Sequence, residues 1–198
     1  MSQNKVKRNG SLTSERFLLA EIRIVARHIL QGLTDCEILD QVIQNNEFQF
    51  PTQARIRTTV SACLKRLSPI KDDEQMLNLL VDAPVDVAAQ INVYLLIKYH
   101  DLVRSLLVDE IGHRYQTFDY SFSKVDMGAF IDQYLYERDI DWADSTIKRV
   151  KGTLHHILIE GKYQVPNSDE LLYVFLNPDL EDFMRSHCDE DLLPAFNM

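Results

Sequence analysis

The sequence predicts a mainly α-helical protein, with a helix-turn-helix-like unit at the amino end, a central helical layer and a winged-helix-like unit at the carboxyl end. Apolar residues recur at three- and four-residue steps along most of the 198-residue chain, which is typical of amphipathic helices. Residues that cap or end helices separate these periodic segments. Two short apolar runs around a turn, within residues 162–176, favour a β-hairpin.

Residues 1–71 hold a short basic arm and three predicted helices. The first helix ends at Gly32, and Thr34 or Asp35 caps the second. After a loop, Thr52 caps the third helix, TQARIRTTVSACLKRL, which the following Ser-Pro pair brings to an end. The second and third helices have the outline of a helix-turn-helix, although the loop between them is longer than the tight turn of the simplest examples.

Residues 72–118 form the predicted central spine. A short helix over DEQMLNLLVD precedes Pro84, which is well placed in the first turn of a long helical run through about Tyr115. Asp101 and Gly112 are candidate positions for a break in that run. Such a central layer usually has only a packing role.

Residues 119–198 contain the predicted winged-helix-like unit and a tail. Ser123 caps one helix, a linker with Trp142 follows, and STIKRVKGTLHHILIEG is then strongly periodic. The runs KYQV and LLYVFL, separated by PNSDE, predict the two strands of a hairpin. A final helix follows Pro178. A helix followed by a hairpin is the order of a winged helix.

Charge is distributed unevenly along this acidic chain. Residues 1–71 hold 11 Lys and Arg against 6 Asp and Glu, a net charge of +5. The remainder holds 10 against 24, a net charge of −14, and together they give the −9 of the whole chain. Because local clusters determine the field that a phosphate backbone experiences, overall acidity does not exclude a nucleic-acid partner.

Targeting signals are missing from the sequence, and we expect a cytoplasmic protein. The longest apolar stretch, INVYLLIKYHDLVRSLLV, is interrupted by charged residues and by a histidine, so it does not predict a membrane span. The start lacks the apolar core of a signal peptide. Cys36, Cys63 and Cys188 are scattered and odd in number, which favours reduced thiols over a disulfide framework.

The third predicted helix is the first candidate DNA contact. On a helical wheel, Ile56, Val60, Cys63 and Leu67 form a compact apolar stripe. Small polar residues and arginines suit close approach to base edges and phosphates. The predicted contacts lie away from the stripe or at the helix start: Thr52, Gln53, Arg55, Arg57, Thr58, Ser61 and Lys65. An ordinary surface helix with outward arginines is the alternative interpretation.

The periodic helix of the carboxyl end is the second candidate. Its side opposite the apolar stripe carries Ser145, Arg149, Gly152 and His156, with Lys148 beside them and Lys162 where the wing would start. A glycine within a helix weakens it by about 1 kcal/mol relative to alanine, but lets another backbone come close. Asp169 and Glu170 in the predicted wing would repel phosphate. A winged helix used only for protein contacts therefore stays an alternative.

The basic arm is the third candidate. Lys5, Lys7 and Arg8 are predicted to track the duplex, along a minor groove in the manner of homeodomain arms. A solvated leader without a role is the alternative.

Catalytic chemistry has little support in the sequence. His155 and His156 are adjacent and point about 100° apart on a helix, which makes a poor metal pair. Glu160 and Lys162 resemble the end of a nuclease motif, but no preceding strand supplies the aspartate. The chain also lacks a phosphate-binding glycine loop and a nucleophile elbow. We therefore predict no enzyme activity, no catalytic residue, no metal site and no cofactor.

The order of these motifs resembles one protein family. The segment AEIRIVARHILQG, a helix ending in NN, TQARIRTTVSACLKRL, the central YLLIKYHDLVRSLL and STIKRVKGTLHHILIEGKY together look like the BrxA proteins of bacterial BREX phage-defence systems. The resemblance spans nearly the whole chain. It implies a small, helical, non-enzymatic DNA-binding component that acts beside a methyltransferase, a phosphatase-like protein and ATPases.

The sequence thus predicts a double-stranded-DNA-binding component of a BREX system, with other BREX subunits as partners. No membrane and no small-molecule substrate are expected. A protein-interaction adaptor that docks other subunits is the main alternative. The similarity of the family to NusB-type antitermination factors keeps RNA binding open.

Overall fold

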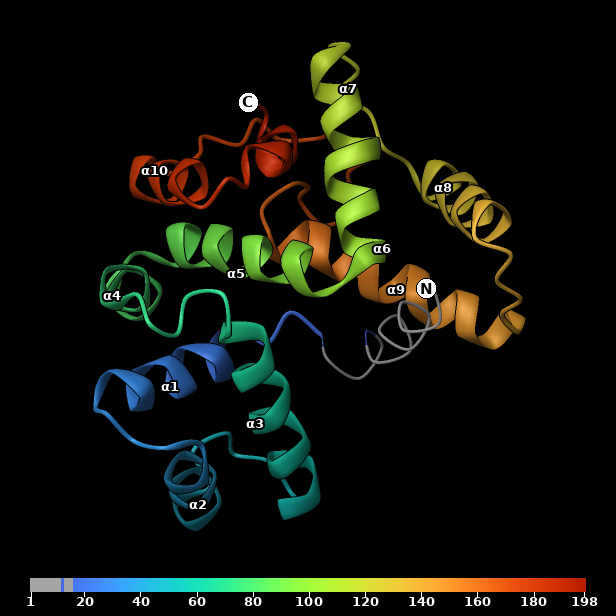
Figure 1. Ribbon diagram of the computed structural model, residues 1–198. Helices are drawn as coiled ribbons and strands as arrows, with labels where there is room; N and C mark the ends of the chain where they lie inside the picture. Colours follow the sequence, from blue (N-terminus) through green and yellow to red (C-terminus); the bar gives the residue numbers. More distant parts are fainter. Residues whose placement is uncertain (1–11, 13–15) are drawn as a thin grey trace. The chain divides into compact units, whose positions relative to one another are not determined.

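The computed structural model describes residue 12 and residues 16–198, and this part of the chain is all-α (Figure 1). The predicted fold class is confirmed at this level. The elements in chain order are α1 (Leu19–Leu30), α2 (Asp35–Asn45), α3 (Gln53–Leu67), α4 (Glu74–Asp82), α5 (Val85–Tyr99), α6 (Asp101–Arg104), the π-helical η2 (Ser105–Ile111), α7 (Gly112–Gln116), α8 (Lys124–Glu137), α9 (Asp144–Glu160), α10 (Pro178–Ser186) and the 3-10 helix η3 (Glu190–Phe196).

Two compact units make up the fold. Phe17–Leu95 form the amino-terminal unit, and Leu96–Met198 form most of the carboxy-terminal unit, so the boundary falls within α5. The division predicted from the sequence at residues 71 and 118 stays a prediction.

Local capping determines where the helices of the amino-terminal unit begin. Of the two predicted caps for α2, Thr34 is the cap, and Glu37 completes a capping box. The Glu37 carboxylate accepts hydrogen bonds from the N–H and the hydroxyl of Thr34 at 2.8 and 2.7 Å, which lowers the pKa of Glu37. The predicted cap of α3, Thr52, accepts a hydrogen bond from the N–H of Arg55. Gly32 ends α1 with φ of 78°, a conformation that favours glycine.

A buried arginine lies at the centre of the amino-terminal unit. The side chain of Arg66, on α3, is fully buried, and its Nη1 donates to the carbonyl oxygen of Phe17 at 2.8 Å. Asn92, on α5, donates to the same oxygen at 2.6 Å. Because Phe17 and Leu18 lead into α1, these bonds hold the start of α1 against α3 and α5. The sequence pattern alone does not indicate this role for Arg66.

The long helical run predicted after Pro84 breaks at His100, next to the candidate Asp101. His100 is extended, with φ of −118° and ψ of 113°. The other candidate break, Gly112, is helical and continues η2 into α7. Gly112 instead lies against Pro194, because a Cβ built on it would stand 2.8 Å from the proline Cβ and 3.0 Å from its backbone. The missing side chain therefore lets η3 approach the central helix.

Arg114, on α7, links the central helix to the start of α8. Its guanidinium donates to Glu110 at 2.7 Å, to Asp119 at 2.9 Å and to Asp126 at 3.3 Å. It also donates to the carbonyl oxygen of Ser121. Three carboxylates and a carbonyl from different parts of one segment thus converge on a single cation.

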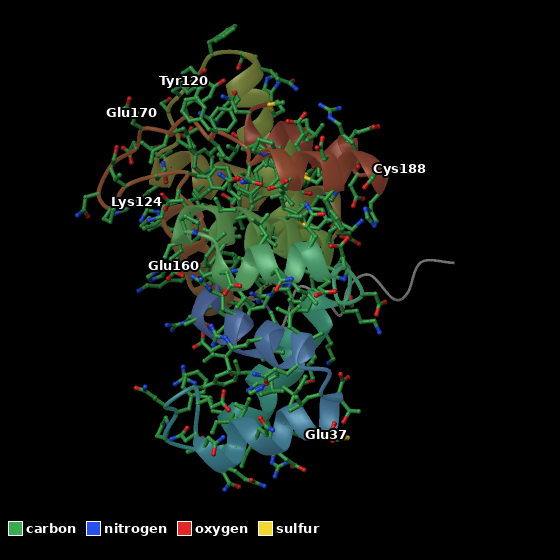
Figure 2. The ribbon with its side chains drawn as sticks, turned by 90° about the vertical axis from the view of Figure 1, so that its left-hand side faces the viewer. Glu37, Tyr120, Lys124, Glu160, Glu170 and Cys188 are labelled. Atoms are coloured by element: carbon green, nitrogen blue, oxygen red, sulfur yellow. The ribbon has the colours of Figure 1, made fainter. Side chains whose placement is uncertain are left out.

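The predicted β-hairpin is wrong, because the described chain holds no strand there. Residues 169–171 pair instead with residues 120–122, through an isolated bridge between Ser121 and Glu170 and two backbone hydrogen bonds of 2.7 and 2.9 Å. Figure 2 shows the two segments side by side at the labelled Tyr120 and Glu170. The end of the predicted turn and the first residue of the predicted second strand therefore pair with a segment that precedes α8.

Competition for backbone donors explains the loss of the hairpin. The N–H groups of Tyr163 and Gln164 donate to the carbonyl of Leu158 at 2.8 and 3.2 Å, so they end α9 instead of forming a ladder. Pro166 has no N–H to offer. One backbone hydrogen bond joins the two runs, from the N–H of Leu172 to the carbonyl of Tyr163 at 2.8 Å.

Two helical glycines give the first prediction. Gly112→Ala should destabilise the protein by about 1–3 kcal/mol because the new methyl group overpacks the contact with Pro194. Gly152→Ala is the matched control, since a Cβ there meets no atom within 4 Å and alanine favours a helix by about 1 kcal/mol. Urea denaturation measures both, and equal stability of the two variants would contradict the close packing at Gly112.

Candidate nucleic-acid interface

Helix α3 buries the stripe that the sequence predicts. Ile56, Val60, Cys63 and Leu67 are all buried. The buried arc is wider than predicted because α1 and α2 both pack against α3, and it also takes in Arg66. The predicted contact residues are exposed without exception: Thr52, Gln53, Arg55, Arg57, Thr58, Ser61 and Lys65.

These α3 side chains fall into two groups. Arg57, Ser61 and Lys65 line a groove of about 570 Å³ that also borders α1 and α2. Arg55 lies apart from the groove, with its guanidinium over the ring of Phe50 at 4.1 Å, in the loop before α3. This cation–π contact orients Arg55 while leaving its N–H groups at the surface.

The remaining three residues lie near the start of α3. Thr52 is committed to capping, and the hydroxyl of Thr58 donates to the carbonyl of Ala54 at 3.0 Å. Gln53 is exposed at the first position of the helix. At this end of α3, the exposed hydrogen-bond donors that could contact DNA are therefore the amide of Gln53 and the guanidinium of Arg55.

Helix α9 presents the predicted outer face. Ser145, Lys148, Arg149, Gly152 and His156 are all exposed, while the apolar side of the helix is buried at Val150, Leu154, Ile157 and Leu158. The imidazole of His156 lies 3.9 Å from a carboxylate oxygen of Glu160, one turn later. The geometry thus brings five of the six predicted residues of this unit onto one helix.

The sixth residue, Lys162, follows α9 and is exposed. Its backbone is left-handed, with φ of 67°, where the chain turns away from the helix axis. Asp169 and Glu170 are also exposed in the segment that was predicted as the wing. Negative charge therefore stays close to this unit, as the sequence suggests.

The basic arm lies outside the described residues. The predictions for Lys5, Lys7 and Arg8 therefore stay predictions. Among the described residues there is no group of three or more His, Cys, Asp or Glu side chains that could hold a metal ion. The helices of the described chain include none long and apolar enough to cross a membrane.

Sequence reasoning missed a pocket between the first turn of α8 and the middle of α9. Lys124 and Lys151 border it together with Gly152 and His155. Burial, and then the charge of Lys124, lower the pKa of His155, which favours its neutral form. The mid-helix glycine was the one signal in the sequence that could have indicated this opening.

A family model and a curated relative point to the same family. The family model described as BrxA matches residues 7–188. The chain belongs to the BrxA family. A curated relative, the BREX protein BrxA of Bacillus cereus strain H3081.97, is 21% identical over 181 residues, which cover 89% of this chain and 90% of that protein. The predicted family resemblance is confirmed.

A solved structure shares the fold of this BrxA-family chain. The crystal structure of an uncharacterised protein from Magnetospirillum magneticum matches with a TM-score of 0.79 and 18% sequence identity. The match covers 94% of this chain and 96% of that chain. At this identity the likeness extends to the fold alone.

The arginines of α3 give a prediction about stability. Arg66→Ala should destabilise the protein by about 2–5 kcal/mol, because it leaves a cavity and removes a donor from the buried carbonyl of Phe17. Arg57→Ala, on the exposed side of the same helix, should change the free energy of unfolding by less than about 0.5 kcal/mol. Chemical denaturation compares them, and a mild effect of Arg66→Ala would show that the buried contact is dispensable.

The cap of α8 gives a prediction about pH. Hydrogen bonds from the hydroxyl and the N–H of Ser123, and the charge of Arg114, lower the pKa of Asp126. A lowered folded-state pKa contributes stability above the unfolded value of about 3.9, and this contribution is lost as the pH falls through the folded value. Ser123→Ala should therefore cost about 1 kcal/mol at pH 7 and progressively less below about pH 4.

Thermal unfolding across pH measures this difference between Ser123→Ala and the parent. Ser61→Ala, an exposed serine within α3, is the control and should match the parent at every pH. A deficit for Ser123→Ala that stays constant into acid would rule out the contribution of the Asp126 carboxylate.

Proposed function

We propose that this BrxA-family protein is a non-enzymatic, double-stranded-DNA-binding component of a BREX phage-defence system. The observation that carries the proposal is the exposure of small polar and basic side chains on α3 and α9, each behind a buried apolar stripe. Such faces suit close approach to phosphates and base edges. Membership of the BrxA family, which includes a protein named as a BREX protein, supports the biological setting.

The connections around α8 and α9 support a winged-helix-like reading of the carboxy-terminal unit. Residues 120–122 precede α8, and α9 follows α8. After α9, residues 169–171 contact residues 120–122, and Leu172 donates a backbone hydrogen bond to Tyr163. We propose that this arrangement, held by three backbone hydrogen bonds and without a hairpin, takes the place of a wing. In the proposed function α9 is the recognition helix and α8 is its support.

Local charge favours α3 as the stronger contact. The first 71 residues have a net charge of +5, whereas α9 lies in a sequence region with a net charge of −14. Asp169 and Glu170 add negative charge near α9 that opposes a phosphate backbone. We therefore assign most of the electrostatic affinity to Arg55, Arg57 and Lys65, and a smaller share to Lys148 and Arg149.

Binding should weaken steeply with salt. With about 4–6 phosphate contacts, raising salt from 50 to 200 mM should reduce affinity for duplex DNA by roughly 10²–10³-fold, because bound cations are released. Fluorescence anisotropy with labelled duplex and with labelled double-stranded RNA measures this dependence. Absence of binding to any duplex at low salt would favour the adaptor, and a preference for RNA would favour the NusB-type alternative.

Two double variants separate the faces. Arg55→Ala with Arg57→Ala should weaken binding to all sequences and flatten the salt slope by about one unit per lost contact. Lys148→Ala with Arg149→Ala should have an equal or smaller effect. Arg104→Ala with Arg185→Ala, which removes two partly exposed cations from outside both faces, is the control for net charge. Parent-like DNA binding by both face variants, with loss of a BREX subunit in a pull-down, would establish the adaptor instead.

A further inference from the structure

A pocket of about 230 Å³ lies within the carboxy-terminal unit, between α8 and α9. Its apolar walls come from Phe122, Met127 and Leu158, which are all buried. Pockets for drug-sized ligands span roughly 300–1,000 Å³. The volume therefore suits a smaller apolar body, of the size of one ring system.

Gly152 opens the mouth of this pocket. It lines the pocket from the middle of α9, and a Cβ built on it would meet no atom within 4 Å. A larger side chain at this position would therefore project into open space at the mouth. Glycine weakens a helix, and at position 152 it keeps the mouth of the pocket open.

Two lysines border the same pocket from the two helices. Lys124 begins α8, and Lys151 reaches from α9 so that its Nζ is 3.3 Å from a Cβ built on Gly128 of α8. Neither lysine forms an ion pair with a carboxylate of the described chain. His155 is held toward its neutral form, so the two ammonium groups supply the positive charge. Asp169 also borders the pocket and opposes part of that charge.

A buried amide adds a polar group to the apolar wall. Gln164 is 3% exposed, and its Nε2 donates to the carbonyl of Phe122 at 2.7 Å. This bond fixes the amide orientation, and no described group donates to the Oε1 that remains. Because Gln164 lines the pocket, Oε1 is an oriented acceptor for a ligand donor.

We propose that this pocket binds one nucleotide, with the base between the apolar walls and the phosphate between Lys124 and Lys151. A base is a small, flat body with N–H donors for Gln164, and a phosphate is the anion that paired ammonium groups attract. Inorganic phosphate would leave the apolar walls unused, and an uncharged ring would leave the lysines unused. The pocket therefore suits a ligand that has both an aromatic ring and an anionic group.

The nucleotide has two sources with this shared chemistry: a free mononucleotide, or a nucleotide extruded from a DNA strand. Extrusion of a base into a pocket requires that the base be unstacked, and this cost is least at a mismatch. The pocket borders α9, the proposed recognition helix, so the second source rests on the proposed function. The first does not.

The test uses the intact protein and a fluorescent probe, 2-aminopurine deoxyriboside 5′-monophosphate. The free probe should bind, and the corresponding nucleoside and inorganic phosphate should each bind at least about tenfold more weakly, because each lacks one half of the contacts. Lys124→Ala with Lys151→Ala should weaken probe binding by about tenfold or more. Gly152→Leu should abolish it by occupying the mouth. Lys71→Ala, an exposed lysine of the other unit, is the control and should bind the probe like the parent.

A second experiment places 2-aminopurine in a mismatched base pair of a DNA duplex. Fluorescence that rises when the parent protein binds, but not when the Lys124→Ala, Lys151→Ala variant binds, identifies the strand as the source. Free-probe binding without this rise identifies the mononucleotide. Failure of the free probe and of the duplex signal, with intact duplex affinity, overturns the pocket and leaves the proposed function standing. Equal binding of an aromatic carboxylate and the nucleotide overturns the recognition of a base.

Discussion

The guanidinium of Arg114 is the interaction on which the carboxy-terminal unit depends. It joins carboxylates at Glu110, Asp119 and Asp126 and the carbonyl of Ser121, so it fixes the chain between α7 and α8. That chain supplies the partner for residues 169–171 and the first turn of α8. Burial of a charge is costly unless hydrogen bonds and opposite charges compensate it, and here both do. The direction of α8, and hence the wall it gives the pocket beside α9, follows from this cluster.

The amino-terminal unit also has a buried arginine, Arg66, and two of the groups that it contacts are neutral oxygens. Arg66 is fully buried, and its Nη1 donates to the carbonyl of Phe17 and to the side-chain oxygen of Asn92. A carbonyl that accepts from both Arg66 and Asn92 joins three helices at one oxygen. Arginines of one helix therefore differ in role: Arg66 is buried and holds the fold, while Arg55 and Arg57 are exposed and are the proposed DNA contacts. Residue type alone does not separate these roles.

The sequence predicted the helices well and the hairpin badly, for a physical reason. Helix caps are local, so Thr52 and Ser123 are readable from a few neighbouring residues. Strand pairing is a competition between distant partners, and residues 169–171 pair with residues 120–122, almost 50 positions earlier. The exposed faces of α3 and α9 were predictable from periodicity. The pocket was not, because it needs Lys124 of one helix beside Lys151 of another.

An acidic chain that binds DNA gains electrostatic attraction only at local basic faces, and this constrains how the proposed contacts work. Affinity from counterion release grows with the number of neutralised phosphates, and residues 72–198 hold 10 Lys and Arg against 24 Asp and Glu. Contacts that discriminate must then come from groups with fixed geometry. An oriented amide at Gln164 and two lysines on different helices supply such geometry at one place. Under the proposed function, the basic face of α3 would supply attraction to DNA and the pocket beside α9 would supply discrimination, so the two units would divide these tasks.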